Sequence, residues 1–317
     1  MDGLKENFEV DLVYLWVDGN DPAWRQKRAP YVKESYSDSE MASEARYQDN
    51  GELKYSLRSV EKFAPWIRKI FIVTDNQVPE WLDTSTPQIK IIDHKDILPV
   101  QALPCFNSTV IEHFLYKIPD LAEHFLYSND DMFFNKPVFV EDFFTPDGRP
   151  IVRLNRRIFR KFWLNFHGRI MGKKTSYYNR VIENAAELVE RATGKYIGHK
   201  SHHNIDAYRK SDYRHTYETF ENDIAPVIVN HIRNDNDIER LIYSFFPITE
   251  KKAKVKFVTQ KESYRCHIEH KHHITDMDKF SPMLFCVNDS QDADRESHEM
   301  VAELLNRKFP HKSRFEK

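Results

Sequence analysis

The tripeptide Asn129-Asp130-Asp131 is the part of this chain best suited to chemistry. It follows the apolar run of residues 124–128, which is typical of a buried strand, and it precedes Met132. Two carboxylates at the end of a buried strand are costly unless a cation or hydrogen bonds neutralise them. At such a strand end, a divalent cation held by carboxylates can bridge the diphosphate of a substrate. A simple Asx turn is the competing interpretation.

Two further acidic residues follow apolar runs. Asp289 comes after the run of residues 284–287, and Asp18 with Gly19 comes after residues 10–17. In a doubly wound sheet, the crevice beside the first strand receives the base or ribose of a nucleotide. Asp18 and Gly19 are therefore candidates for binding a nucleotide, although an Asp-Gly turn explains them equally well.

The elements that would position these residues alternate between strand and helix. A polar interval follows the first strand, and Leu53, Leu57 and Val60 then have helical spacing up to Pro65. Asn107 is placed to cap a helix that carries Val110, and short apolar strands are predicted at residues 70–74 and 89–92. This alternation predicts an α/β fold with a mostly parallel sheet and helices on both of its faces.

Three parts of the chain differ in character. Residues 1–150 are predicted to form an α/β core. Residues 151–253 are rich in Arg, His, Tyr and Phe and have a mainly helical pattern, for example at residues 182–192, so we expect an insertion that lines one wall of the site. Residues 254–317 are predicted to return to the core, with a strand at 254–259 and a helix at 292–309.

Composition excludes several classes of protein. Among 317 residues, 47 Lys and Arg against 49 Asp and Glu give a net charge of -2, so no global field would recruit nucleic acid. Three cysteines are too few for a disulfide framework. The first residues lack the features of a secretory signal, and no apolar run approaches the length of a membrane span. We therefore expect a cytoplasmic protein, either free or peripheral to the membrane.

Several blocks of this sequence resemble the Stealth family, whose members transfer hexose-1-phosphate in capsule synthesis and include GlcNAc-1-phosphotransferase. The first block begins at Asp11, the second begins at Arg46 and extends to Asp131, a looser third block surrounds His199, and the fourth contains Asp289. The resemblance implies a scaffold like that of the glycosyltransferase A-type enzymes, in which residues 1–150 would bind a nucleotide-sugar and residues 151–253 would line the acceptor side.

Roles for individual residues follow from that resemblance. It implies that Asp131 and Asp289 bind Mg²⁺ or Mn²⁺, with Asp130 as a second ligand or an orienting residue in catalysis. Arg58, which lies beside the apolar position Leu57 of the predicted helix, would bind a donor phosphate; a solvated helix arginine is the alternative.

The third block implies a general base. His199 matches the histidine of the family's His-x-Pro, although Ser201 stands in place of the proline. A neutral imidazole near pH 7 could accept the proton of an acceptor hydroxyl. The arginine that usually follows in this block is missing near Thr219, and the sequence leaves open whether Arg214 or Arg233 replaces it.

The expected reaction is the transfer of a sugar-1-phosphate from a nucleotide-sugar, with UDP-sugars favoured, to a hydroxyl of a growing capsular or exopolysaccharide. The capsule-assembly machinery at the inner face of the membrane is an expected partner. An ordinary metal-dependent glycosyltransferase would use the same carboxylates but release a nucleoside diphosphate. A non-catalytic glycan-binding protein is a third reading, and the paired carboxylates argue against it.

Overall fold

A five-stranded sheet forms the centre of the protein. A computed structural model describes residues 8–32, 47, 51–157, 160, 176–290 and 292–317. The strand order is β3-β2-β1-β4-β8. The bounds of these strands are β1 Val10–Leu15, β2 Ile70–Thr74, β3 Ile89–Asp93, β4 His124–Asn129 and β8 Asp206–Arg209. The first four are parallel and β8 is antiparallel to β4, so the predicted α/β fold with a mostly parallel sheet is confirmed.

The two faces of the sheet bury different sets of side chains. Leu12 and Tyr14 of β1 point to one face, whereas Val13 points to the other, as the alternation of a strand requires. Both sets are buried, because a parallel sheet covered by helices on both sides must be apolar on both faces.

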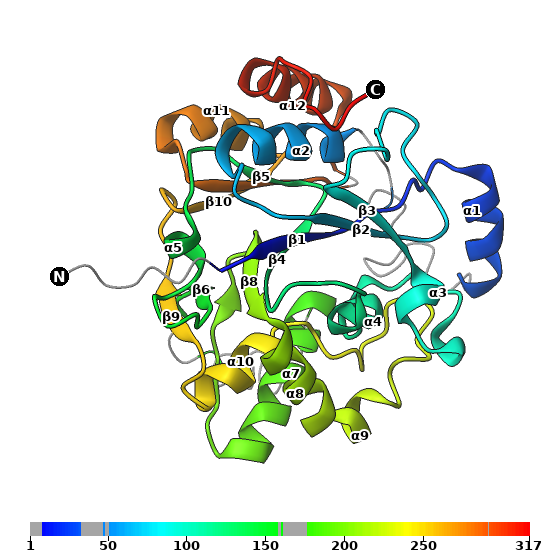
Figure 1. Cartoon of the computed structure of the whole chain (residues 1–317), viewed down its shortest axis with the longest axis vertical. Coiled ribbons are helices and arrows are strands. Elements are labelled where there is room, and N and C mark those ends of the chain that lie inside the picture. The colour runs from blue at the N-terminus through cyan, green and yellow to red at the C-terminus, as the bar shows by residue number, and fades with distance from the viewer. Residues whose placement is uncertain (1–7, 33–46, 48–50, 158–159, 161–175, 291) are drawn as a thin grey trace.

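Helices cover the sheet on both faces, as predicted (Figure 1). On one face lie α2 (Glu52–Phe63) and, beyond it, α12 (Arg295–Lys308); on the other lie α4, α7, α8 and α10. The bounds of the latter are Ser108–Glu112, Tyr177–Thr193, Lys210–Thr219 and Ile242–Thr249. The other α-helices that the described residues show are α1 Pro22–Arg28, α3 His94–Ile97, α5 Val140–Phe143, α9 Glu221–Ile224 and α11 Lys271–Phe280.

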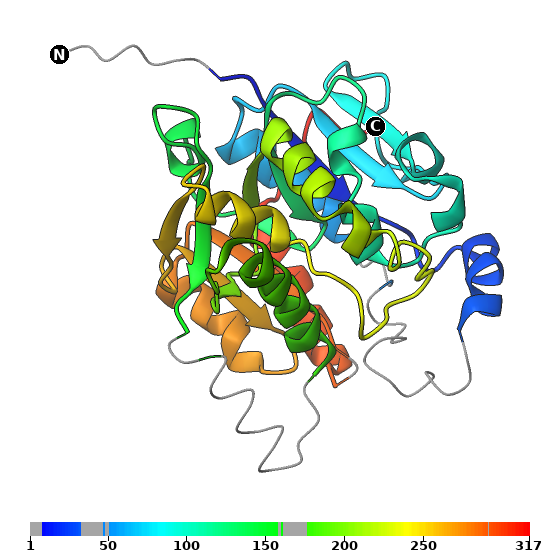
Figure 2. The same cartoon turned by 90° about the horizontal axis from the view of Figure 1, so that it is seen from below.

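Two three-stranded sheets complete the fold, and Figure 2 shows them from below. One has the order β10-β11-β5 and the other β7-β6-β9. Their strands are β5 Met132–Phe134, β6 Ile151–Asn155, β7 Lys200–Ser201, β9 Lys254–Phe257, β10 Ser263–His267 and β11 Leu284–Asn288. Since β5 directly follows β4 and pairs with β11, it joins the later part of the chain to the end of the main sheet.

Some element boundaries differ from the expected ones. The helix capped by Asn107 ends at Glu112, and a separate 3-10 turn at Leu115–Lys117 replaces its expected continuation. The final helix begins only after Asp294, whose side chain accepts a hydrogen bond from the Ser297 amide. The described part of residues 151–253 contributes four helices and also three strands, one of which, β8, is the edge strand of the main sheet. Residues 158–159 and 161–175 of this range lie outside the described part of the chain. Within the described part of the chain, no helix has both the length and the apolarity to span a bilayer.

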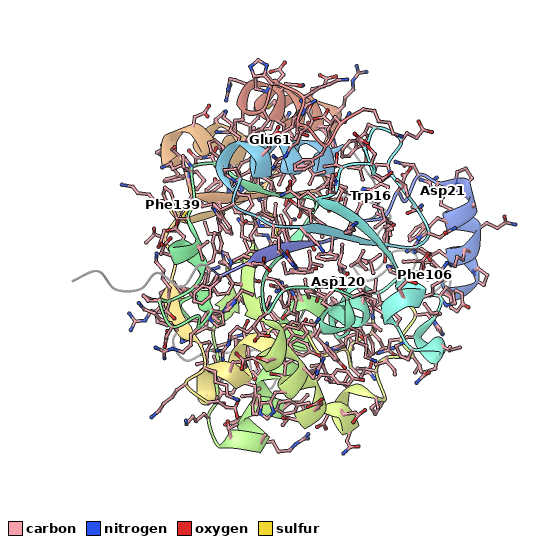
Figure 3. The ribbon with its side chains drawn as sticks, in the orientation of Figure 1. Trp16, Asp21, Glu61, Phe106, Asp120 and Phe139 are labelled. Atoms are coloured by element: carbon pink, nitrogen blue, oxygen red, sulfur yellow. The ribbon has the colours of Figure 1, made fainter. Side chains whose placement is uncertain are left out.

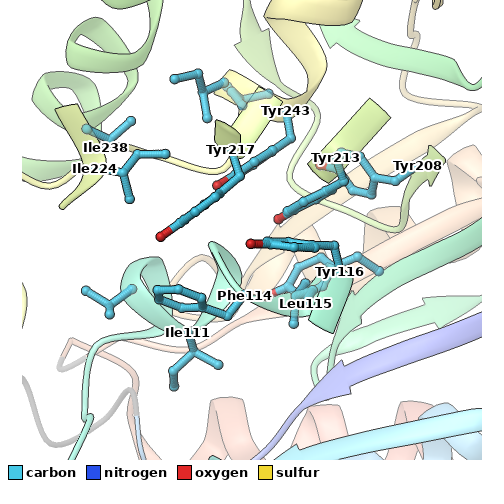
Figure 4. Close-up of a cluster of buried hydrophobic side chains, with 14 of the residues drawn as sticks. Ile111, Phe114, Leu115, Tyr116, Tyr208, Tyr213, Tyr217, Ile224, Ile238 and Tyr243 are labelled. Atoms are coloured by element: carbon cyan, nitrogen blue, oxygen red, sulfur yellow. The ribbon is translucent and has the colours of Figure 1, made fainter. Parts of the chain in front are cut away.

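A cluster of aromatic side chains fixes the helices of one face to one another (Figure 4). Tyr213 of α8 and Tyr243 of α10 stack with ring centroids 3.7 Å apart, and Tyr217 packs against Phe114. Aromatic rings bury large areas in few rotamers, so this cluster provides a rigid base for the segment that follows β8.

Asp11 joins three segments at the amino end of the sheet. It is fully buried, and its carboxylate accepts two hydrogen bonds from the Arg68 guanidinium, at 2.8 and 2.6 Å. The backbone amides of Lys69 and Ala122 also donate to it. A single carboxylate thus ties β1 to the segments that precede β2 and β4.

We expect Asp11→Ala to lower the free energy of unfolding by about 2–4 kcal/mol, because it leaves buried donors without an acceptor. Glu9, which contacts the same Arg68 from a side chain that is 72% exposed, is the matched control. Glu9→Ala should cost less than about 1 kcal/mol. Urea denaturation of the two variants is the measurement, and equal midpoints would contradict this role of Asp11.

Candidate functional site

A cleft of about 710 Å³ opens at the carboxyl ends of β1, β4 and β11. This is where an open α/β sheet places its ligands. Trp16 and Val17 follow β1, Asp130 and Asp131 follow β4, and Asp289 follows β11. The structure therefore brings Asp130, Asp131 and Asp289, which the sequence singled out separately, to one cleft.

Asp131 occupies the deepest position among these carboxylates. Antiparallel pairing of β11 with β5 places Cys286 opposite Met132, so the Cys286 thiol donates to Asp131 Oδ2 at 3.2 Å. Asp131 Oδ1 is buried with no hydrogen-bond partner among the described residues. Burial raises the pKa of Asp131, and the thiol and the nearby Arg265 only partly oppose this shift. A cation at Oδ1 would relieve the same penalty.

The atoms around Asp131 allow a test of which metal fits. Asp131, His203 and Cys286 offer ligand atoms that lie within 4.8 Å of one another. Burial raises the pKa of the Cys286 thiol well above its usual value, so the thiol acts as a hydrogen-bond donor rather than as a thiolate ligand. The oxygen donors of Asp131 and Asp289 suit a hard divalent cation such as Mg²⁺. The chemistry of these two carboxylates therefore fits the expected metal, although the ligand cluster around Asp131 does not include Asp289.

Asp289 is held by its own neighbours. Its Oδ1 accepts from the Ser290 amide at 2.7 Å, and its Oδ2 lies 3.1 Å from His298 Nε2 of α12. Although burial alone would lower the pKa of His298, its bonds to Asp289 and to the Asp294 carbonyl raise it. His298 thereby orients Asp289 from outside the cleft.

Cations face the carboxylates across the cleft. Arg233, Lys200, His203 and Arg265 all line it. Arg233 donates to the Ser108 hydroxyl at 3.1 Å and lies over the Tyr177 ring, whereas Arg214 is exposed on α8 and does not line the cleft. Of the two arginines that the sequence left open, the structure brings Arg233 to the site.

Aromatic side chains form the end of the cleft nearest α1. Trp24 packs against Tyr47 and Phe106, with ring centroids 5.2 and 5.3 Å apart, and Trp16 lies after β1. Figure 3 labels Trp16 and Phe106 at this end of the sheet. Such a wall can stack a planar base or a sugar ring.

Asp18 and Gly19 lie just beyond this wall. The Asp18 carboxylate accepts a hydrogen bond from the Asn20 backbone amide, as in an Asx turn. The backbone amide of Asp18 donates to the side-chain oxygen of Gln77. Gly19 donates to the Tyr47 carbonyl, and a Cβ at Gly19 would lie 2.1 Å from that oxygen. Neither residue is among the described residues that line the cleft, so their binding of a nucleotide stays a prediction.

Arg58 points away from the cleft. Its guanidinium forms a two-bond fork with Glu316, both bonds at 2.7 Å, and also donates to the Phe309 carbonyl. Arg58 does not line the cleft, and its side chain is only 12% exposed. The donor-phosphate role stays a prediction that no contact of the described residues supports. The observed contacts instead fix α2 to the segment after α12.

The structure also separates His199 from the cleft. Its Nδ1 accepts from the Arg157 amide at 3.3 Å, and its ring packs against Phe257. His203, four residues later, lines the cleft beside Asp131. Burial, followed by the charges of Arg265 and Arg240, lowers the pKa of His203 well below its usual value. The role of His199 as a base thus stays a prediction, and of these two histidines His203 is the one that lines the cleft.

Sequence reasoning missed His203, Arg265 and Cys286. Cys286 lies inside the fourth block and could have been noted as the neighbour of Asp289. Arg265 belongs to β10, a strand that was not predicted, and nothing in the sequence distinguished this arginine from the others. His203 was hidden among several histidines of residues 199–215.

Residues 8–36 match the family model of Stealth protein CR1, conserved region 1, and residues 46–152 match Stealth protein CR2, conserved region 2. The chain is 32% identical over 293 residues to the capsular polysaccharide phosphotransferase fcs1 of Haemophilus influenzae, a match that covers 89% of this chain and 78% of that protein.

Two exopolysaccharide phosphotransferases match a shorter part of the chain. Cps2G of Lactiplantibacillus plantarum is 48% identical over 143 residues, which are 45% of this chain and 41% of that protein. SCO6021 of Streptomyces coelicolor is 53% identical over 142 residues, which are 44% of this chain and 26% of that protein. The chain thus spans less than half the length of these two relatives.

Solved structures also match most of the chain, at low similarity. The galactosyltransferase LgtC, solved with donor and acceptor sugar analogues, has a TM-score of 0.45 and 14% identity, and covers 94% of this chain and 95% of that one. This likeness is too distant to locate a site.

The α/β fold, the acidic cleft and the named relatives define an enzyme of the transferase class. The chain belongs to the Stealth family, as its sequence blocks suggested.

We expect Arg58→Lys and Glu316→Gln to lower the free energy of unfolding by a similar amount, about 1–3 kcal/mol. Each substitution weakens the same buried pair of hydrogen bonds between the two side chains. Donor KM should stay within about threefold of the wild-type value in both variants, since neither residue lines the cleft. Thermal unfolding and donor kinetics are the measurements. A rise in donor KM confined to Arg58→Lys would instead support the donor-phosphate role.

Proposed function

We propose that this protein transfers a sugar-1-phosphate from a nucleotide-sugar to a hydroxyl of a polysaccharide acceptor, with a uridine diphosphate sugar as the favoured donor. The observation that carries the proposal is the meeting of Asp131 and Asp289 in one cleft with Arg233 and Arg265. Phosphoryl transfer needs a cation across the diphosphate and positive groups for the other oxygens. The names of the phosphotransferase relatives support the same assignment.

The proposed reaction breaks one bond to phosphorus and forms another. The acceptor oxygen attacks the phosphorus that bears the sugar, and the bond from that phosphorus to the bridging oxygen breaks. The products are a phosphodiester and a nucleoside monophosphate, and the hydroxyl proton passes to a base. Asp131 and Asp289 would hold Mg²⁺ or Mn²⁺, which when bound neutralises charge on the diphosphate.

The chain's own residues supply the remaining tasks. Arg233 and Arg265 would bind phosphate oxygens, for which a planar guanidinium is suited. The aromatic wall of Trp16, Trp24 and Phe106 would stack the base or sugar of the donor. We assign the role of base to His203, because it lies beside Asp131 and its lowered pKa keeps it neutral.

We expect Asp131→Asn and Asp289→Asn each to lower kcat by at least about 10²-fold with the fold intact, because an amide keeps the shape but loses the charge that holds the cation. Asp278→Asn, which changes an exposed carboxylate on α11, is the control and should remain active. The assay incubates the purified protein with Mg²⁺ or Mn²⁺, nucleotide-sugars and capsule fragments, and measures released nucleotide.

The released nucleotide decides between reactions. Nucleoside monophosphate supports the proposal, whereas nucleoside diphosphate would mean attack at the sugar carbon by an ordinary glycosyltransferase. Full turnover in EDTA would contradict the metal requirement. A protein that binds glycans but releases no nucleotide under any of these conditions would be a binding protein.

We expect His203→Ala to lower kcat by about 10²- to 10⁴-fold, the usual contribution of a general base, while donor affinity changes little. His199→Ala is the matched variant and should remain within a few-fold of wild type, because its ring packs against Phe257 outside the cleft. Single-turnover rates and donor binding are the measurements. A large loss of kcat in His199→Ala with little change in His203→Ala would instead assign the role of base to His199.

A further inference from the structure

A second pocket of about 340 Å³ lies beside the cleft, in the range typical of ligand sites. Its cationic or ionisable residues are Arg157, Lys200, His202, His203, Arg265 and His273. None of the described residues that line it is a carboxylate. We call it the basic pocket. Tyr178, Lys200, His203 and Arg265 line both hollows, so the basic pocket continues into the cleft.

Arg157 and Lys200 of the basic pocket form no ion pair with a carboxylate among the described residues. Nearby Asp206 pairs instead with Arg240 at 2.8 Å and with His202 at 3.0 Å, and Glu262 pairs with Lys256. Burial, together with the charges of Arg160, Arg157 and Arg265, lowers the pKa of Lys200. Bringing like charges together without counter-charge is unfavourable unless a ligand supplies it.

Two buried donor atoms of the basic pocket also lack acceptors. Arg265 Nε and the Tyr178 hydroxyl are buried and have no hydrogen-bond partner among the described residues. Buried donors are nearly always paired in native proteins, so each marks the place of a missing acceptor. Both residues lie where the two hollows join.

We propose that the basic pocket binds a phosphodiester of the acceptor chain while the acceptor hydroxyl lies in the cleft. This inference rests on the proposed function, because the product of that reaction is itself a phosphodiester. An acceptor that has already been extended therefore carries such an anion behind its terminal sugar. The donor diphosphate belongs instead near Asp131 and Asp289, neither of which lines the basic pocket. The enzyme would thereby prefer acceptors that it has already extended.

The test uses the full chain and bis-glycerophosphate, a phosphodiester flanked by two polyols, as the probe in calorimetry. Arg157 lines the basic pocket but not the cleft, and Arg157→Gln keeps the backbone bond to His199. We expect this variant to weaken binding of the diester about tenfold, the loss of one charge-assisted hydrogen bond. Lys254→Gln, which removes an exposed cation of β9 outside both hollows, should bind like wild type.

Further measurements distinguish a phosphodiester from inorganic phosphate and from a lipid headgroup as the anion that the basic pocket binds. Wild-type binding of inorganic phosphate as tight as that of the diester would overturn the assignment to a diester, and so would equal binding of the diester by Arg157→Gln and wild type. Co-sedimentation with phosphatidylglycerol vesicles that depends on Arg157 would reassign the basic pocket to a lipid headgroup. Asp131→Asn should lose turnover but keep diester binding, so failure of the proposed reaction and failure of the basic pocket are distinguishable.

Discussion

The site depends on the contacts of one buried cation, the guanidinium of Arg240. It lies 2.8 Å from Asp206 of β8 and 3.7 Å from Glu112 of α4, and it stacks 4.1 Å above the Tyr127 ring of β4. Removing a charge from water costs several kcal/mol unless the charge is paired. Replacing Arg240, Asp206 or Glu112 would therefore leave a buried charge without a partner. Asp206 also bonds to His202, which precedes His203 in the chain. One buried cation therefore attaches the segment that carries His203 and the basic pocket to the main sheet.

Much of the fold could be predicted from the sequence because its signals are local. The helix at residues 52–63 and the strand at residues 70–74 have the predicted bounds, since regular apolar spacing and Pro65 fix them. Asn107 caps its helix as expected, because an N-cap depends on only a few residues. The place of Asp130 and Asp131 at the carboxyl end of β4 also follows from a general rule, that an open α/β sheet holds its ligands at the carboxyl ends of its strands. Asp289 reaches the same cleft by another route, because β11 pairs with β5 in a separate sheet.

The rest could not be predicted because it depends on contacts between distant segments. Whether Arg58 faces a substrate or Glu316 is decided by the packing of α2 against the segment after α12, which no spacing encodes. The placement of His203 rather than His199 in the cleft depends on a two-residue strand, β7, and on the left-handed backbone of His203, with φ of 54°. The antiparallel placement of β8 likewise requires Arg240 and Asp206 to meet across the core.

The pairing of β11 with β5 has a consequence for how the protein is made. Asp131 leaves the ribosome long before Asp289, yet the two carboxylates become neighbours in one cleft only when β11 reaches β5. At about 5–20 residues per second, the interval between them is roughly ten to thirty seconds. During that time the parallel core can already fold while the cleft lacks one of its acidic walls. A nascent chain of this protein would therefore be folded in part before the Asp289 carboxylate joins the cleft.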